Sequence, residues 1–350
     1  MPEPRIYLDH AATTPVLAEA RAAMLAALET WHNPSSPHAE GRAAKAALER
    51  ARTTVAAALG WSGQVIFTSG ASEALAIALG RAKGGRRFVS SVEHDAVFRA
   101  APDAVSLPAD AQGQVRLDAV DGERPVVAVQ HANNETGILQ PLDEIAAEVR
   151  ARGGVLVADC AQSAGKLPLP DADMIAISAH KFGGPPGVGA LLVRDLALVE
   201  AVGGQEQGYR AGTQNLPGIN AMAVALETGS EWLREAARLR ERLEAALLAA
   251  GGEVVGGISR RIATIGAYRM PGVAAAAQLI QFDLAGIAVS AGSACSSGSL
   301  KASHVLAALG MSSVAAGEVI RVSFGRATTS EEVDRFAAVW TDMAARCRAA

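Results

Sequence analysis

Lys181 lies between two apolar runs that the sequence predicts as buried strands, and this placement makes it the first candidate for chemistry. The stretch Ser178-Ala179-His180-Lys181-Phe182-Gly183-Gly184 follows one such run, at residues 174–177, and precedes another at residues 188–193. An ammonium group is costly to desolvate, so a lysine in this position is a poor choice for stability. A desolvated lysine loses its proton readily and can form a Schiff base. The alternative is a Gly/Pro turn whose lysine reaches solvent, and this stretch taken alone favours that alternative.

Two polar clusters follow earlier predicted strands. Thr68-Ser69-Gly70-Ala71-Ser72-Glu73 leads into a helix that begins near Ala71, and the free N–H groups of a helix N-terminus bind phosphate. The alternative for this cluster is an ordinary capping box. In Val92-Glu93-His94-Asp95, the histidine can lie flat on a ring or move a proton near neutral pH. A capped helix start with a solvated histidine has about equal support.

Two more clusters follow later strands, namely Asn133-Asn134-Glu135-Thr136-Gly137 and Asp159-Cys160-Ala161-Gln162. Ligands of open α/β sheets bind at the carboxyl ends of the strands, where these polar residues are expected. Lys181 follows Asp159 by 22 residues, which leaves room for one crossover and one further strand. We therefore expect both residues on neighbouring strand ends. A lysine, an acid, a flat histidine and a phosphate site together describe a pocket for pyridoxal phosphate.

The elements that must position these residues alternate between strand and helix. Apolar runs predict strands at residues 65–68, 87–90, 126–130, 155–158, 174–178 and 188–193. Continuous apolar runs are typical of strands covered on both faces, so we expect a doubly wound, largely parallel α/β sheet. Helices are predicted at residues 15–31 (with Thr14 as N-cap), 39–59 and 217–250.

Gly251-Gly252 ends the last of these helices and is a natural domain boundary. Beyond it, short strands and helices are predicted at residues 262–265, 274–285, 288–290, 300–309, 319–324 and 330–348. We therefore expect a large α/β domain at residues 16–250. A smaller α+β domain is expected at residues 1–15 and 251–350, and the N-terminal strand at residues 6–8 belongs to it.

Composition excludes several classes of protein. Of the 350 residues, 50% are hydrophobic, and the net charge of -4 comes from interspersed charges, so no basic stripe indicates a nucleic-acid partner. No signal peptide and no uncharged apolar run of about 18 residues is present, so no membrane span is expected. Three cysteines are too few for a disulfide framework or a Cys-x-x-Cys metal site, which favours a cytoplasmic protein without a metal.

The clusters above also carry a family resemblance. Six segments resemble the cysteine desulfurases, enzymes of the class V aminotransferase family that depend on pyridoxal phosphate and share fold type I: Tyr7-Leu8-Asp9-His10-Ala11-Ala12-Thr13-Thr14-Pro15, Asn33-Pro34-Ser35-Ser36, Phe67-Thr68-Ser69-Gly70-Ala71-Ser72-Glu73, Asn133-Asn134-Glu135-Thr136-Gly137, Ser178-Ala179-His180-Lys181 and Arg210-Ala211-Gly212-Thr213. The likeness runs in order from Tyr7 to about Phe336.

A seventh segment, Ser290-Ala291-Gly292-Ser293-Ala294-Cys295-Ser296-Ser297-Gly298-Ser299, resembles the loop of the NifS/IscS-type branch and not the shorter loop of the SufS branch. Small residues predict a flexible loop that lets Cys295 travel. A helix start near Leu300 would favour its thiolate. The alternative is a Ser/Gly linker with an incidental cysteine.

The resemblance implies a role for each matching residue. Lys181 would hold the cofactor and move the Cα proton, His94 would stack on the ring and assist proton transfer, and Cys295 would take the sulfur of L-cysteine as a persulfide, leaving L-alanine. The residues implied to bind the rest of the cofactor are Asp159 (pyridine nitrogen), Gln162 (ring oxygen), Asn134 (beside them), and Ala71, Ser72, Ser178, His180 and Thr213 (phosphate), the last from the second subunit of a homodimer. Arg321 would clamp the substrate carboxylate, and a sulfur acceptor such as an iron–sulfur scaffold would take the persulfide. A lone strand arginine is more often a surface salt bridge.

The sequence differs from the family pattern at several positions, and alternative functions were weighed. Leu75 stands where the family often has asparagine, and Pro186 replaces a frequent lysine. The spacers at residues 102–121 and 251–272 are shorter than is usual in the family, and this difference is expected to affect how partner proteins dock. Selenocysteine or cysteine sulfinate are alternative substrates, and a partner-binding protein that keeps the fold without catalysis is an alternative class. A nicotinamide oxidoreductase is disfavoured because no Gly-x-Gly-x-x-Gly follows the first strand. Cys160 and Cys347 are interpreted as structural or incidental.

Overall fold

The computed structural model describes residues 5–30, 32–292 and 303–349. Its larger sheet has seven strands in the order β2-β8-β7-β6-β5-β3-β4. These strands are β2 (Gln64–Thr68), β3 (Arg87–Ser90), β4 (Val105–Leu107), β5 (Val126–Gln130), β6 (Val155–Asp159), β7 (Met174–Ser178) and β8 (Gly189–Val193). β8 runs antiparallel to both of its neighbours, and the pairs from β7 to β4 are parallel. The prediction of a largely parallel α/β sheet is confirmed.

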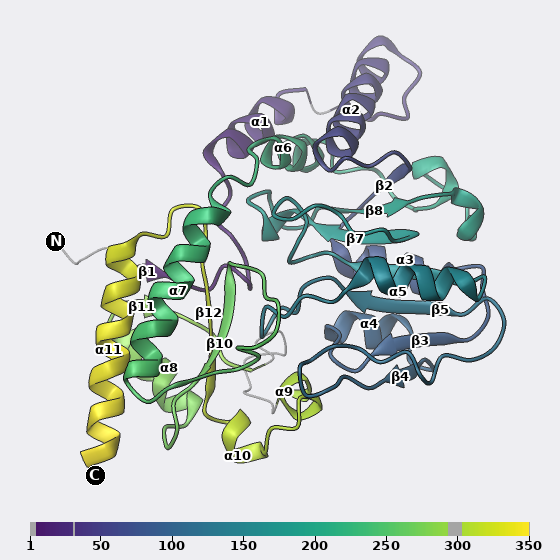
Figure 1. Ribbon diagram of the computed structural model, residues 1–350. Helices are drawn as coiled ribbons and strands as arrows, with labels where there is room; N and C mark the ends of the chain where they lie inside the picture. Colours follow the sequence, from purple (N-terminus) through teal and green to yellow (C-terminus); the bar gives the residue numbers. More distant parts are fainter. Residues whose placement is uncertain (1–4, 31, 293–302, 350) are drawn as a thin grey trace.

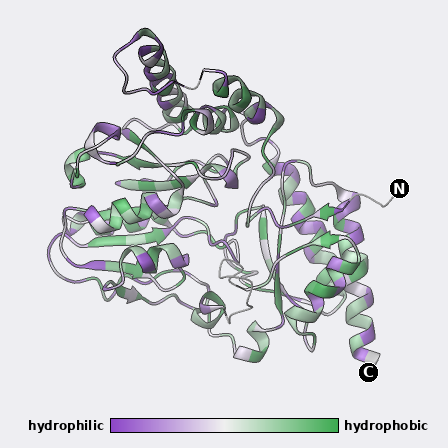
Figure 2. Cartoon of the chain, turned by 180° about the vertical axis from the view of Figure 1, so that it is seen from behind, coloured by the Kyte–Doolittle hydropathy of each residue, from purple (hydrophilic) through white to green (hydrophobic). Residues whose placement is uncertain are grey.

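Helices cover both faces of this sheet (Figure 1). Along β5, Val127 and Val129 pack with α1 (Ala18–Leu28), α2 (Ala39–Ala58), α5 (Leu142–Ala151) and α6 (Leu216–Glu227) in one core cluster. Val126 and Ala128 pack on the other face with α3 (Ala71–Arg81) and α4 (Asp95–Ala100). Successive side chains of a strand point to opposite faces, so both faces need apolar residues. This accounts for the continuous apolar runs: every residue of β5, β6, β7 and β8 is buried, and the strands are green in Figure 2.

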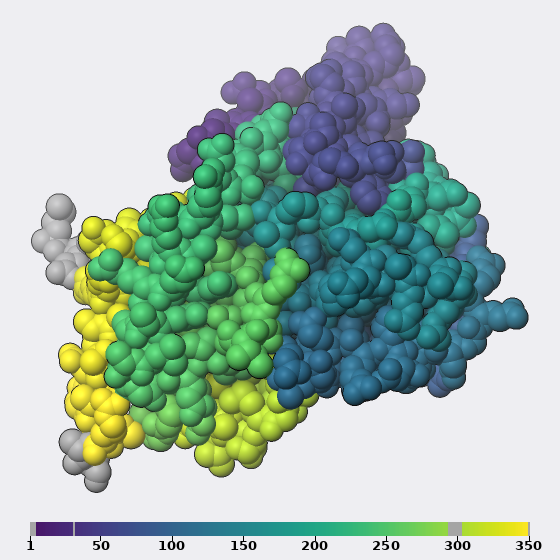
Figure 3. Space-filling view, in the orientation of Figure 1, coloured from purple at the N-terminus to yellow at the C-terminus, as the bar shows by residue number. Residues whose placement is uncertain are grey.

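The C-terminal part of the chain builds a second, smaller sheet. β12 (Val319–Ser323), β10 (Ile265–Arg269) and β9 (Glu253–Val254) form an antiparallel sheet. The other elements of this part are α7 (Leu233–Ala249), α8 (Ala275–Leu284), β11 (Ile287–Ala288), α9 (His304–Ala308), α10 (Ser313–Ala316) and α11 (Ser330–Ala349). β1 (Ile6–Tyr7) pairs in parallel with β11, far from the strands that follow it in sequence. Figure 3 shows the C-terminal part, in green and yellow, packed directly against the blue and teal large-sheet part.

Aromatic residues fill the core beneath the smaller sheet. Phe282 of α8 and Phe336 of α11 stack with ring centroids 4.5 Å apart, and Trp340 lies 6.1 Å from Phe336. All three side chains are buried, with leucines of α7 in the same cluster. These contacts explain why α7 and α11 lie side by side at the edge of the molecule (Figure 1).

Two helix predictions were wrong. The helix predicted at residues 217–250 is two helices, because Gly229 adopts a left-handed φ of 73° and the chain turns between α6 and α7. The helix predicted from Pro15 begins at Ala18, because Thr14 N and Leu17 N donate hydrogen bonds to His180 O (2.8 Å) and Gly183 O (2.9 Å). Those bonds hold residues 14–17 against the segment that follows β7.

Smaller differences occur among the short elements. The strand predicted at residues 262–265 lies at 265–269 as β10, since Ile262 N bonds instead to Gly137 O at 2.8 Å. β4, β9 and α10 were not predicted, and each has four residues or fewer. The predicted helix at 300–309 corresponds to α9, and residues 300–302 lie outside the described residues.

Candidate active site

A cavity of about 340 Å³ opens where β5, β6 and β7 reach their carboxyl ends. Ten residues predicted for the site line it: Ala71, Ser72, His94, Asn134, Asp159, Gln162, Ser178, His180, Lys181 and Arg321. Leu75 and Pro186, which depart from the family pattern, line it as well. Ala11 and Ala12, from the turn after β1, complete one wall.

Lys181 ends η1 (Ala179–Lys181), the single turn that continues β7. Its Nζ donates hydrogen bonds to the carbonyl oxygens of Ala11 (2.7 Å) and Ala12 (2.8 Å). Gln162 Nε2 also donates to Ala11 O, at 2.9 Å. Asp159 ends β6, which pairs in parallel with β7, so the expectation that Asp159 and Lys181 lie on neighbouring strand ends is confirmed.

Asp159, which lines the cavity, interacts with a second buried carboxyl group, that of Glu93. Burial raises the pKa of Asp159, against the opposing effects of the Ala161 N–H (2.8 Å), His94 and Lys181. Glu93 is fully buried, and its Oε1 accepts from Gln130 N at 2.7 Å. Burial, and then the charge of Asp159, raises the pKa of Glu93 well above its usual range. The sequence reasoning missed Glu93, whose position next to His94 was its signal.

His94 is the N-cap of α4, and its Nδ1 accepts a hydrogen bond from Ala96 N at 3.1 Å. A nitrogen that accepts an N–H carries no proton, so the neutral ring holds its proton on Nε2. The helix-capping alternative for His94 is confirmed, and the residue also lines the cavity, where its role in stacking or proton transfer stays a prediction. In this tautomer Nε2 acts as a donor.

The N-terminus of α3 forms another wall. No described side chain caps this helix, and Gly70 precedes it with φ of 154°. A Cβ on Gly189 would lie 2.6 Å from Gly70 Cα, so the close approach of β8 requires a glycine there. Glu73 accepts from Ser69 N at 2.5 Å and pairs with Arg210 at 3.0 Å, but the N-cap is Gly70, so the capping box considered above is not formed. The amides of Ala71 and Ser72 make no hydrogen bond within the described chain, as an anion site requires.

His180 lies beside this wall. Its Nδ1 is 3.1 Å from Thr13 Oγ1. Burial, followed by the charge of Lys181, lowers the pKa of His180 to about 4, so the ring is neutral at pH 7. A neutral ring offers one N–H donor and leaves the other nitrogen as an acceptor.

Arg321 projects from β12 and is buried, so it is no surface salt bridge. One terminal nitrogen donates to Asn134 O at 3.0 Å, and the other donates to Asp9 Oδ1 at 2.8 Å. Its Nε is buried without a hydrogen-bond partner in the described part of the chain. The sequence reasoning missed Asp9 as the partner, although the residue stands in a motif that was singled out.

Lys166 was also missed. It is 7% exposed, and its side chain forms no hydrogen bond or ion pair with the residues that the structure describes. Burial, and then the charge of Lys181, lowers its pKa to about 7. Burial lowers the pKa of His10 to about 4, with a smaller contribution from Lys166. The signal in the sequence was a lysine in apolar surroundings, seven residues after Asp159.

Two predicted residues are not among those that line the cavity. Thr213 is exposed in the loop between η3 (Glu206–Gly208) and α6. The base of this loop is held by Glu206, which pairs with Arg52 at 2.7 Å and accepts from Phe67 N at 2.9 Å. Cys295 lies outside the described residues.

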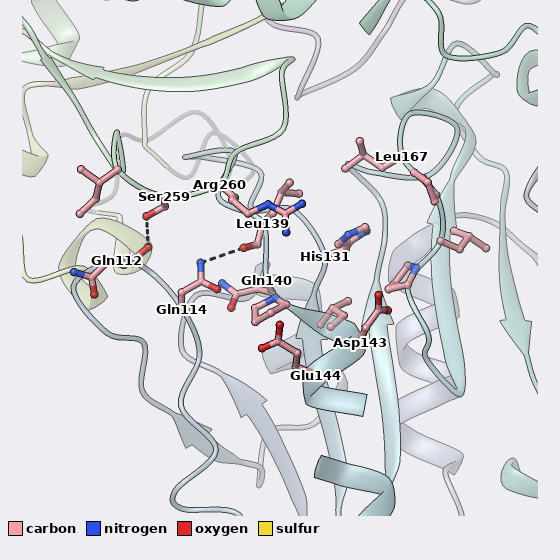
Figure 4. A pocket seen from close by; sticks show the side chains of 16 residues that line it. Gln112, Gln114, His131, Leu139, Gln140, Asp143, Glu144, Leu167, Ser259 and Arg260 are labelled. Atoms are coloured by element: carbon pink, nitrogen blue, oxygen red, sulfur yellow. Dashed lines mark hydrogen bonds between the residues drawn. The ribbon is translucent and has the colours of Figure 1, made fainter. Parts of the chain in front are cut away.

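A larger cavity of about 550 Å³ lies elsewhere (Figure 4). It is lined by Gln114, His131, Leu139, Asp143 and Arg260, among others, and by none of the predicted site residues. One of its polar side chains is engaged locally, since Gln114 Nε2 donates to Leu139 O at 3.1 Å. Acidic, basic and apolar groups are mixed along its walls, which points to no particular chemistry.

Metal and membrane sites were also sought. Among the described residues, no group of three or more His, Cys, Asp or Glu side chains is placed to hold a metal ion. Within the same residues, every helix is too short or too polar to cross a membrane.

Comparison with known proteins places the chain in a family. The model of the family described as aminotransferase class-V matches residues 6–336. The chain is 36% identical to a cysteine desulfurase of Rhodobacter capsulatus, over 99% of this chain and 98% of that protein. The structure is similar to that of a NifS-like protein from Rickettsia africae (TM-score 0.89, 28% identity, 97% and 99% of the two chains). It is also similar to "SspA in complex with cysteine" (TM-score 0.79, 28% identity, 91% and 98%). The resemblance of the motifs is thereby confirmed, and the chain belongs to the class V aminotransferase family and, within it, to the cysteine desulfurases.

Proposed function

We propose that this protein is a pyridoxal-phosphate-dependent cysteine desulfurase that moves the sulfur of L-cysteine onto its own Cys295. In the overall reaction the C–S bond of the substrate breaks and an S–S bond forms at Cys295. The products are L-alanine and a Cys295 persulfide, and no external oxidant or reductant is required. The observation that carries the proposal is the meeting of Lys181, Asp159 and His94 in one cavity, opposite an uncapped helix N-terminus.

The residues present fit the cofactor. A buried carboxylate is costly unless a cation lies against it, and a protonated pyridine nitrogen would supply that cation to Asp159. Gln162 Oε1 is buried with no hydrogen-bond partner in the described chain, so a polar ligand group is expected beside it. The amides of Ala71 and Ser72, with Ser178 and His180, would hold the phosphate. When bound, pyridoxal phosphate withdraws electrons from the Cα of an attached amino acid.

The chain's own residues would do the remaining work. Lys181 would attach the cofactor and then, as a free amine, take the Cα proton of the substrate. His94, with its proton on Nε2, would donate a hydrogen bond towards the reacting atoms and so assist proton transfer. Arg321 would bind the substrate carboxylate with Asn134 beside it, since its bonds to Asp9 and Asn134 use two of its five N–H donors and leave the Nε–H without a partner in the described chain.

The proposal includes a homodimer, a sulfur acceptor and a cytoplasmic location. Thr213 is exposed while its loop is fixed by the buried Glu206, as expected of a residue that reaches the phosphate of a second subunit. The persulfide would pass to an acceptor protein such as an iron–sulfur scaffold. Cys160 and Cys347 are both free thiols, which agrees with a reducing compartment.

Two substitutions test the central roles. Cys295→Ala should keep the visible absorption of the bound cofactor and lose persulfide formation, whereas the matched thiol variant Cys347→Ala should behave as the wild type. Lys181→Ala should lose the borohydride-trappable attachment of the cofactor, and Lys45→Ala, on the exposed face of α2, should retain it. Alanine formation by Cys295→Ala at the wild-type rate would contradict the role of the thiol. Turnover on L-cysteine, selenocysteine and cysteine sulfinate, measured side by side, decides the substrate.

A further inference from the structure

Residues on both sides of the Cys295 segment (residues 291–302) are bonded to Arg321, which lines the cavity, or to Glu135, which directly follows the cavity-lining Asn134. Before the segment, Ser290 pairs with Arg321: Ser290 N donates to Arg321 O at 3.2 Å, and Arg321 N donates to Ser290 O at 2.7 Å. After it, Ser303 follows Cys295 by eight residues and is 4% exposed. Ser303 Oγ donates to Glu135 Oε2 at 2.5 Å. The segment that would deliver the thiol therefore starts and ends at fixed points.

Glu135 is itself fixed relative to the cavity. It is 5% exposed and lies in a turn in which Asn133 Oδ1 accepts from the amides of Glu135 (2.9 Å) and Thr136 (2.8 Å). Its neighbour Asn134 lines the cavity, and the carbonyl oxygen of Asn134 accepts from Arg321. The Glu135 carboxylate therefore connects Ser303 to the same wall that holds Arg321.

The residue after Ser303 makes a second connection. His304 Nε2 donates to Glu93 O at 2.8 Å, and its ring lies edge-on to Phe98 with centroids 5.5 Å apart. Glu93 directly precedes His94, which lines the cavity. Two consecutive residues at the start of α9 are thus bonded to residues adjacent to Asn134 and His94, and Figure 1 shows α9 next to the large-sheet part.

The bond to Glu135 is more than a helix cap. Ser303 Oγ already caps α9 by accepting from Leu306 N at 3.0 Å. Ser312 caps α10 in the same way, with Ala315 N at 3.2 Å, but it is exposed and bonds no carboxylate within the described chain. Capping a short helix requires no buried carboxylate, and burying one is costly. The added cost at Ser303 indicates a requirement for position.

We propose that Glu135, through Ser303, is a positioning residue that fixes the point at which the chain resumes after the Cys295 segment, and so the approach of the thiol to the substrate sulfur. The proposal rests on the function proposed above. A misplacement of about 1 Å in a group that must meet a bound substrate lowers a rate by up to about 100-fold.

The kinetic test compares Glu135→Leu, Glu135→Gln, Ser303→Ala and the matched control Ser312→Ala as cofactor-loaded enzymes. Glu135→Leu and Ser303→Ala should lower the rate of persulfide formation on Cys295 at saturating L-cysteine by about 10- to 100-fold. The KM for L-cysteine and the cofactor absorption should stay within about 2-fold of the wild type, since neither residue lines the cavity. Glu135→Gln keeps an oxygen acceptor, so it should lower the rate of persulfide formation less than Glu135→Leu does. Ser312→Ala should stay within about 2-fold of the wild type.

A second readout does not depend on turnover. Amide hydrogen exchange of residues 304–309 should be faster in Glu135→Leu than in the wild type and unchanged in Ser312→Ala. Persulfide rates in Glu135→Leu equal to wild type, equal losses in both serine variants, or unchanged exchange would each overturn the proposal. If Glu135→Leu does not fold, the rates of persulfide formation in Ser303→Ala and Ser312→Ala are compared instead, and a loss in Ser303→Ala alone supports the proposal. A wild-type protein that forms no alanine from L-cysteine would refute the proposed function. The hydrogen-exchange comparison would still show whether Glu135 holds Ser303 and the start of α9 in place.

Discussion

Replacing Lys166 with methionine should change how the stability of this protein depends on pH. Lys166 is buried beside His10 and Lys181, and burial together with the charge of Lys181 lowers its pKa from the ordinary 10.5 to about 7. In the unfolded chain the same amine keeps its ordinary pKa. Between about pH 7 and pH 10.5 the unfolded state therefore binds more protons than the folded state, and stability rises with pH across that window.

The magnitude follows from the two pKa values. Each unit between them corresponds to about 1.4 kcal/mol, so the fall from 10.5 to about 7 costs about 5 kcal/mol below pH 7 and nothing well above pH 10.5. Between pH 7 and pH 10 the wild type should regain about 3–4 kcal/mol from this group. Lys166→Met cannot bind the proton, so its advantage in the free energy of unfolding should be about 3–4 kcal/mol larger at pH 7 than at pH 10.

The assay is urea unfolding of wild type and Lys166→Met, both prepared without cofactor, at half-unit steps from pH 7 to pH 10. Comparing the two proteins at each pH cancels the titration of the groups that they share. Lys45→Met, in which the replaced lysine is exposed on α2, serves as the matched control and should follow the wild type at every pH. A difference between Lys166→Met and wild type that stays constant to within about 1 kcal/mol across this range would refute the reasoning, because Lys166 would then titrate as in the unfolded chain.

Three further substitutions test the site and its supports. Arg321→Lys should raise the KM for L-cysteine about tenfold or more with a smaller effect on kcat, because a charged hydrogen bond contributes about 1.5–3 kcal/mol, and steady-state alanine formation measures both constants. Asp159→Asn should lower kcat by about 100-fold or more while the protein stays folded, as seen by circular dichroism, since an amide cannot balance a protonated ring nitrogen. Glu206→Gln leaves the Arg52 guanidinium without its buried partner and should cost about 3–5 kcal/mol in urea unfolding. Because Glu206 fixes the loop that carries Thr213, the same variant should also weaken cofactor binding in the dimer. An unchanged cofactor affinity would show that the loss of stability does not reach the phosphate site.

The large sheet was predictable because its signal is local. Each central strand is covered on both faces, so it reads as an unbroken apolar run, and β3, β5 and β7 have the bounds that the sequence predicted. The missed features depend on contacts between distant segments. Thr14 and Leu17 bond to the segment after β7 instead of starting a helix, and no local pattern reports those bonds. The break between α6 and α7 had a local signal at Gly229, which the apolar pattern on both sides outweighed.

The site residues also fall into two groups, those that a local pattern predicted and those that depend on contacts between distant segments. Lys181, Asp159 and His94 were predictable because each follows a buried strand, and parallel strands end at one edge of the sheet. The pairing of Asp9 with Arg321 joins residues 312 positions apart, so the sequence offered a carboxylate and an arginine without the link between them. Lys166 was overlooked because its lowered pKa depends on burial, and the few small and apolar residues around it in the sequence do not by themselves predict that burial.

The turn after β1 explains why both ends of the chain are required for the site. Ala11 O accepts from Lys181 and Gln162, which the large sheet positions, while Asp9 binds Arg321 of the smaller sheet. Ser323 ties the turn to β12 a second time, since its amide donates to Leu8 O at 2.8 Å and its Oγ accepts from Ala11 N at 2.8 Å. The proposed base and the proposed carboxylate clamp are thus held against one short segment by different sheets. Their separation is set by how the two sheets pack, so a substitution that shifts the smaller sheet is expected to change substrate binding even where it leaves Lys181 and its strand undisturbed.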